Sequence, residues 1–188
     1  VNDCLASMGH RPLMSLGGGS PVVSSARDAF QKETIRLQSL GWWFNQEIIE
    51  LSPDLSSYVP VPADVLKLAV SNSLPWVSIR ARRLYDNREG KPFTSTSNVR
   101  VAVVRLVAFE DLPYTAQEAI RAATVVRFQK AYDADEYKLR DTNNTMLQSL
   151  AELRAEHTRM VRANFLQDGE GGKFKNRVRH PSYPVRSS

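Results

Sequence analysis

Gly41-Trp42-Trp43-Phe44-Asn45 divides the chain into two kinds of sequence, because helical periodicity precedes it and strand-like periodicity follows it. Two adjacent tryptophans and a phenylalanine are too apolar to leave in water, since burying each ring is worth roughly 2–3 kcal/mol. Gly41 fits the position just past a helix end, and the residues from Trp42 to Ile49 favour extended structure. We therefore predict a structural joint between a helical layer and a sheet at Gly41, Trp42, Trp43 and Phe44.

Before this joint, apolar residues recur at helical spacing in two segments. Val1, Leu5 and Met8 predict the end of an amphipathic helix that stops at Gly9. Ser25, followed by Asp28, predicts the N-cap of a second helix, with Gln38 on its polar side. The expected inner face of this helix consists of Ala26, Ala29, Phe30, Glu33 or Thr34, Leu37 and Leu40.

After the joint, the sequence period shortens toward two, as in strands. The clearest predicted strands are residues 65–70, 77–80 and 99–107. Residues 99–107 are the least polar and are expected to be the central strand. Asn87-Arg88-Glu89-Gly90 is typical of a hairpin turn, with Gly90 supplying a positive φ. These features predict a small antiparallel sheet or sandwich.

Pro113 ends the strand-rich region, and two further helices are expected. Thr115-Ala116-Gln117-Glu118 matches a capping box for the first of them. Its predicted inner face is Ala116, Ala119, Ile120, Ala123, Val126 and then Ala131 or Tyr132. The last helix, from about Asp135 to about Phe165, shows an apolar seam at Leu139, Met146, Leu150, Leu153, His157 and Met160. We expect His157 to be a hydrogen-bonded core or interface residue, because the residues four positions away are not metal ligands.

The predicted fold class is α+β, with a bundle of about four helices, an inserted small antiparallel sheet or sandwich, and an extended C-terminal arm. Residues 1–41 and 113–166 are assigned to the bundle and residues 42–112 to the insertion. Residues 167–188 are assigned to a glycine-rich linker and a basic arm. A chain of 188 residues is long enough to bury a core of this kind.

The formal net charge of +5 lies in that arm. Residues 173–188 contain five basic residues and no acidic one, whereas the other 20 basic residues balance all 20 acidic residues. Two aromatic residues lie among the arm's cations. The residues expected to contact a partner are Lys173, Phe174, Lys175, Arg177, Arg179, Tyr183 and Arg186. This uneven distribution of charge bears on what the protein binds rather than on how it folds.

The sequence offers little for catalysis, and we predict no enzyme, no cofactor and no metal site. Common nucleophile, phosphate-loop and zinc motifs are absent, and the single Cys4 is expected to be a small buried hydrophobe. A hydrolase remains a weaker alternative, since Asp54, Asp64, Glu110 and Asp111 lie near strand ends. No apolar run approaches the roughly 20 residues that span a bilayer, so we expect a soluble protein without a membrane partner.

Three motifs resemble the tail tubular protein A family of short-tailed bacteriophages. Residues 1–13 resemble the family's opening "AVN-x-x-L-x-x-I-G-E-x-P-V", although His10 and Arg11 stand where an acidic residue is frequent. Residues 40–47 are similar to the family's "G-W-x-F-N-x-E". The third match is Phe109-Glu110-Asp111-Leu112-Pro113, which leads into the alanine-rich helix.

This resemblance implies a structural virion protein at the head–tail junction. Its expected partners are the portal protein of the capsid, the tail nozzle formed by tail tubular protein B, and copies of itself in a ring, expected to be a dodecamer. Viral double-stranded DNA would pass through the channel of that ring during ejection. The basic arm is then expected to contact the portal. A DNA-binding module that uses this arm is the main alternative.

Overall fold

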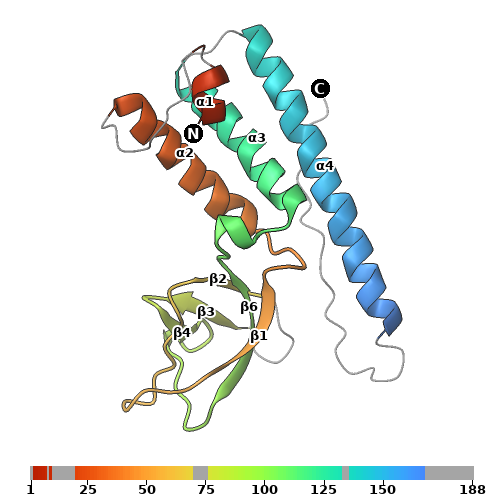
Figure 1. Cartoon of the computed structure of the whole chain (residues 1–188). Helices are drawn as coiled ribbons and strands as arrows, with labels where there is room; N and C mark the ends of the chain where they lie inside the picture. Colours follow the sequence, from red (N-terminus) through yellow and green to blue (C-terminus); the bar gives the residue numbers. More distant parts are fainter. Residues whose placement is uncertain (1, 8, 10–19, 70–75, 133–135, 168–188) are drawn as a thin grey trace.

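The chain forms a layer of helices with two small sheets at one end (Figure 1). The computed structural model describes residues 2–7, 9, 20–69, 76–132 and 136–167. Its helices are α1 Asn2–Ser7, α2 Pro21–Gln38, the 3₁₀ turn η1 Phe109–Asp111, α3 Tyr114–Ala131 and α4 Glu136–Gln167. Its strands are β1 Gln46–Leu51, β2 Val65–Leu68, β3 Val77–Arg80, β4 Arg83–Asp86, β5 Lys91–Pro92 and β6 Val99–Arg105. The predicted α+β class is confirmed.

Helix α3 is the centre of the helical layer, since α1, α2 and α4 all pack against it. Three of its buried residues, Ala116, Ala119 and Ala123, are alanines, whose small side chains allow neighbouring helix axes to approach closely. The core of this layer contains Leu37, Trp42, Leu112, Ala116, Ala119, Ile120, Ala123, Leu150 and Leu153. The predicted inner-face residues from Ala116 to Val126 are all buried, but Thr124 is buried with them, and Phe128 and Gln129 are buried next instead of the predicted Ala131 or Tyr132.

Two predicted helix starts are wrong. Helix α2 begins four residues before Ser25, with Pro21 in its first turn, where the missing N–H costs nothing and the fixed φ suits a helix. Helix α3 begins at Tyr114, so Thr115 lies inside its first turn. The Thr115 hydroxyl donates to the carboxylate of Glu156 on α4 instead of capping its own helix. Both helices therefore start without a side-chain cap.

The sheets are antiparallel and share a second core. Strands pair in the order β1-β6-β2 in one sheet and β3-β4-β5 in the other. The central position of β6 confirms the expectation from its low polarity. Alternate β6 residues face a cluster that includes Leu51, Val59, Val61, Val65, Leu84, Val99, Val101 and Val103. The β4–β5 hairpin turn is also confirmed, with Gly90 at φ +68°.

The β3–β4 turn contains an unexpected pair of left-handed residues. Arg80 pairs with Arg83, so the loop is only Ala81 and Arg82, at φ +48° and +59°. Asn and Gly usually occupy such positions, because a Cβ is crowded there. The turn is held from outside: the Val61 N–H donates to the Arg82 carbonyl, and the Arg82 guanidinium donates to the Val65 carbonyl.

Candidate functional site: the junction between the bundle and the sheets

The chain turns from helix to sheet at Gly41. Its φ is +83°, and an added Cβ would lie 3.1 Å from the Val104 side chain, so both conformation and space favour glycine. Trp42 follows, 2% exposed, and its indole N–H donates to the Leu37 carbonyl at 2.8 Å. Residues 42–45 form a turn, and β1 begins only at Gln46. The expectation of extended structure from Trp42 was wrong because buried hydrogen bonds hold this turn.

The amide of Asn45 is the centre of those bonds. Asn45 is fully buried, and its Oδ1 accepts the Trp42 N–H at 2.8 Å. Its Nδ2 donates to the carbonyls of Gln38, at 3.0 Å, and Arg105, at 2.9 Å. One side chain therefore ties together the end of α2, the turn and the end of β6.

Gln38 forms a second link between the layers. The sequence placed it on the polar side of its helix, but it is 1% exposed. Its Nε2 donates to the Val107 carbonyl at 2.9 Å, and its Oε1 accepts the Val107 N–H at 2.8 Å. A side-chain amide can pair with a peptide group in this way, which satisfies the backbone of the segment leaving β6. The helix-face argument missed Gln38 because the last turn of α2 faces this segment rather than solvent.

Helix α4 reaches the junction through His157. This residue is 4% exposed, and its Nδ1 accepts the Trp43 N–H at 3.2 Å. Its ring also meets Trp42 edge-on, with centroids 5.6 Å apart. The prediction of a hydrogen-bonded core histidine is confirmed. Trp43 and Phe44 are half-buried and meet edge-on at 5.0 Å.

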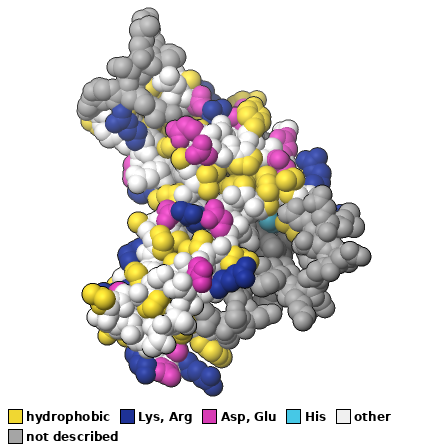
Figure 2. Space-filling view, turned by 60° about the horizontal axis from the view of Figure 1, so that its bottom comes forward, with side chains coloured by type: hydrophobic (Ala, Val, Ile, Leu, Met, Phe, Trp, Pro, Cys, Tyr) yellow, Lys and Arg dark blue, Asp and Glu magenta, His cyan; other side chains and the backbone are white. Residues whose placement is uncertain are grey.

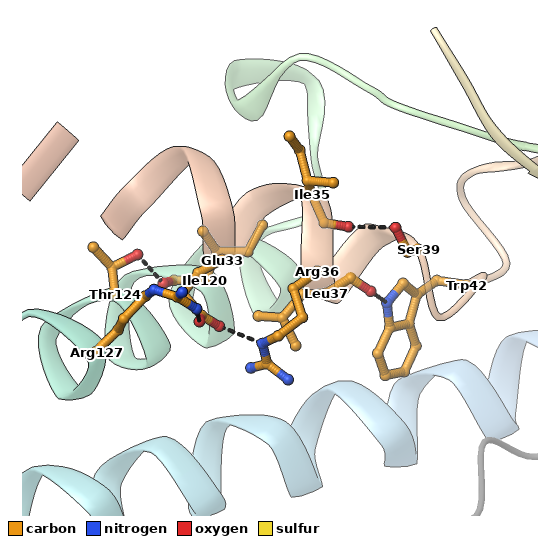
Figure 3. Close-up of polar contacts among 9 residues, drawn as sticks. All are labelled: Glu33, Ile35, Arg36, Leu37, Ser39, Trp42, Ile120, Thr124 and Arg127. Carbon is orange, nitrogen blue, oxygen red and sulfur yellow. Dashed lines mark hydrogen bonds and ion pairs between the residues drawn. The ribbon is translucent and has the colours of Figure 1, made fainter. Parts of the chain in front are cut away.

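Farther into the bundle, Glu33 joins α2 to α3 (Figure 3). Its carboxylate is nearly buried and accepts from Arg36 at 2.6 Å and from Arg127 at 2.8 Å. A buried carboxylate is costly unless it is paired, and two guanidiniums supply the pairing here. Figure 3 also shows the indole of Trp42 bonded to the Leu37 carbonyl, one turn farther along α2.

On the sheet side, Arg105 lies between two carboxylates. It donates to Glu47 at 3.0 Å and forms a closer pair with Asp64. These hydrogen bonds raise the pKa of the Arg105 guanidinium. All three side chains are between a third and a half exposed, so the pairs are screened by solvent. The cluster retains one net negative charge beside β1.

The acids considered for hydrolysis have separate structural roles. Asp54 accepts the backbone N–H groups of Ser56 and Tyr58 in a turn. Asp64 pairs with Arg105, whereas Glu110 and Asp111 lie in η1. No group of three potential metal ligands occurs among the described residues.

A pocket of about 280 Å³ opens between α1, α2, η1 and α3. It is lined by Asp3, Cys4, Arg27, Phe30, Phe109, Arg121, Thr124 and Val125. Burial raises the pKa of the Cys4 thiol, which disfavours a reactive thiolate. Cys4 is 1% exposed, so its predicted role as a small buried hydrophobe is confirmed.

Large apolar side chains also reach the surface (Figure 2). The exposed ones among the described residues are Ile35, Ile48, Leu55, Trp76, Leu106, Tyr114, Tyr137, Leu147 and Met160. Met160 belongs to the predicted seam of α4 but is 40% exposed, whereas Leu150 and Leu153 are buried as expected. None of the described helices is long and apolar enough to cross a membrane.

The residues expected to form the partner-contacting arm, 173–188, lie outside the described residues. The joint residues Gly41, Trp42, Trp43 and Phe44 do meet at one place, where α2, β1, β6 and α4 converge. Sequence reasoning missed the two amides, Gln38 and Asn45, that complete it. The one available signal was their closeness in sequence to the tryptophan pair, since Gln38 lies four residues before Trp42 and Asn45 two residues after Trp43.

Comparison with known proteins finds a family match over most of the chain. A family model described as tail tubular protein matches residues 1–163. Tail tubular protein A of Klebsiella phage KP34 is 29% identical over 113 residues, an alignment that covers 60% of this chain and 60% of that protein. The family match spans the helices, both sheets and the junction between them. The chain therefore belongs to the tail tubular protein family.

Proposed function

We propose that this structural phage-tail protein is an adaptor that joins the capsid portal to the tail nozzle. Copies would form a ring, expected to have twelve subunits, through which the viral double-stranded DNA leaves the head. The observation that carries the proposal is the buried junction, in which Gln38 and Asn45 bond across the helical and sheet layers. The junction holds the helical layer and the sheets in one fixed orientation. An adaptor that binds a different partner at each end requires such an arrangement.

The basic arm, residues 173–188, is the proposed contact with the portal. Its five cations suit an acidic surface, and Phe174 and Tyr183 add apolar anchors. The described body is then free to pack against neighbouring copies and the nozzle. We expect an isolated copy to be a monomer or loose oligomer. The conformational entropy that the arm loses on becoming ordered would be offset only by the contacts it makes on docking.

The direct test mixes the full chain with portal rings from its own phage and images the mixture by negative-stain electron microscopy. The expected result is an added ring, coaxial with the portal. Deletion of residues 173–188 should leave the far-ultraviolet circular dichroism of the body unchanged while reducing the fraction of decorated portals. Portals that remain bare with the full chain would refute the adaptor role. Equal decoration by both chains would refute only the role of the arm.

A further inference from the structure

The outer face of the β3–β4 hairpin carries a concentration of arginine that the fold does not explain. Residues 76–100 contain six basic and two acidic residues, although the chain before the basic arm is balanced overall. Arg80 lies directly opposite Arg83 in the strand pairing, on the face opposite to Ile79 and Leu84, which pack on the sheet core. Like charges directly opposite each other on neighbouring strands destabilise a sheet. A pair of this kind is typical of a surface that is kept for binding.

Both guanidiniums are positioned by aromatic rings rather than neutralised by acids. Arg80 lies 4.1 Å from the centre of the Tyr85 ring, and Arg83 lies 5.0 Å from the centre of the Tyr58 ring. In the described part of the chain, Arg80 has no carboxylate partner, and Arg83 has only a long contact of 3.8 Å with Asp54. Stacking on a ring holds a guanidinium in place while most of its N–H donors stay available to other groups.

Two more arginines extend this cationic surface. Arg82 and Arg88 are exposed, and neither pairs with a carboxylate among the residues that the structure describes. Arginine suits a protein partner, because its planar group binds a carboxylate through two parallel N–H donors and also stacks on aromatic rings. We call this surface the arginine face, and it consists of Arg80, Arg82, Arg83 and Arg88.

The segment after β6 carries the complementary chemistry. Residues 106–120 contain three acidic residues and no basic one, and Glu118 is already paired within α3. Glu110 and Asp111 of η1 are exposed, and no cation within the described ranges pairs with them. Tyr114 follows them and is 72% exposed. We call Glu110, Asp111 and Tyr114 the acidic turn, which offers both kinds of contact that arginine makes.

The arginine face and the acidic turn lie apart within one copy. The acidic turn lies between β6 and α3, where the strands meet the helices, whereas the β3–β4 hairpin lies within the sheet end of the molecule (Figure 1). No ion pair joins the two surfaces among the described residues. Because every copy carries both surfaces, the arginine face of one copy can meet the acidic turn of the next. Such a head-to-tail contact closes a ring when its rotation permits.

A second copy suits the arginine face better than duplex DNA does. DNA phosphates would leave the acidic turn without a cation, and the zero net charge of residues 1–172 gives the body no long-range attraction for a polyanion. We propose that the arginine face of each copy docks on the acidic turn of the next copy. This inference rests on the ring of the proposed adaptor and names the surfaces that join its subunits.

Charge reversal on portals of the phage tests the proposal. Arg80→Glu/Arg83→Glu reverses the arginine face, and Glu110→Arg/Asp111→Arg reverses the acidic turn. Each variant alone should decorate at least about tenfold fewer portals than the parent in negative stain, because like charges then meet at every contact. An equimolar mixture of the two variants should restore decoration to near the parent level. In the mixture, alternating copies again bring opposite charges together, as a ring with an even number of subunits allows.

The matched control is Arg140→Glu/Arg159→Glu, which makes the same change of charge at exposed positions of α4 and should decorate portals as the parent does. An equal loss in this control would contradict the proposal, because the effect would then follow net charge. Parent-like decoration by either reversed variant alone would overturn the proposal. So would a loss that the mixture does not restore, since a misfolded variant or a contact with the portal itself cannot be rescued in this way.

A cross-linking measurement without portals keeps this inference separate from the adaptor role. In a Cys4→Ala background, Ala81→Cys lies in the arginine-face hairpin and Ala108→Cys lies beside the acidic turn, and both positions are exposed. In a concentrated mixture at low salt, the mixed disulfide should form at least about fivefold faster than either symmetrical one, and high salt should remove the difference. Formation at the statistical rate would overturn the copy-to-copy contact. Bare portals with the parent chain would refute only the adaptor role.

Discussion

At the residue scale, the two adjacent tryptophans have different roles. Trp42 is buried and bonds through its indole to Leu37, whereas Trp43 is half-buried and contributes its backbone N–H to His157. Trp42→Ala should lower the free energy of unfolding by roughly 3–5 kcal/mol, and Trp43→Ala by clearly less. Urea denaturation measures both values. Equal losses in the two variants would contradict this difference. Parent-like stability in both variants would show that neither tryptophan side chain belongs to the core.

Asn45 should be as sensitive as a core aromatic residue, although it is small and polar. Asn45→Ala removes the partner of the Trp42 N–H and of the Arg105 carbonyl at a buried site, whereas the Gln38 carbonyl still accepts the Gly41 N–H. We expect a loss of roughly 2–4 kcal/mol in the free energy of unfolding. The exposed Asn98→Ala is the matched control and should change it by less than about 0.5 kcal/mol. A small effect at Asn45 would mean that water replaces its three hydrogen bonds.

At the element scale, one substitution in the β3–β4 turn should raise the stability of the fold. Ala81 adopts φ +48°, which crowds its Cβ, and no described hydrogen bond depends on its side chain. Ala81→Gly should therefore raise the free energy of unfolding by about 1 kcal/mol, since a left-handed backbone costs glycine little. Arg82→Gly is the contrasting variant, because it relieves similar strain but removes the bond to Val65. A thermal melt that shows destabilisation by Ala81→Gly would contradict this account.

The elements themselves were largely predictable, because periodicity reports which side of a helix or strand is buried. Val99–Arg105 was found as the central strand from its low polarity, and the α3 face from its alanines. The starts of α2 and α3 were not predictable from capping patterns, since Pro21 and Pro113 set them by backbone geometry. The burial of polar residues such as Gln38 and Asn45 was not predicted, because some of their hydrogen-bond partners are distant in sequence. Local sequence patterns do not encode such pairings.

At the scale of the whole molecule, the separation of charge predicts where nucleic acid would bind. Residues 1–172 contain equal numbers of basic and acidic residues, and all five excess cations follow them. Any affinity of the full chain for duplex DNA at low salt should thus be lost on deletion of residues 173–188. It should also fall with rising salt in the parent, because phosphate contacts release counterions. Gel retardation that persists after deletion would place a DNA-binding surface on the body.

The paired amides at the junction also have a mechanical consequence. In the described residues, the backbone passes between helices and sheets twice, once after α2 and once after β6, and Asn45 and Gln38 each bond both passages. Tension that separates the two halves would load both passages together, because neither can lengthen until the shared hydrogen bonds break. The junction therefore resists pulling as one stiff unit, and strain applied at either end of the subunit reaches the other end with little extension between them.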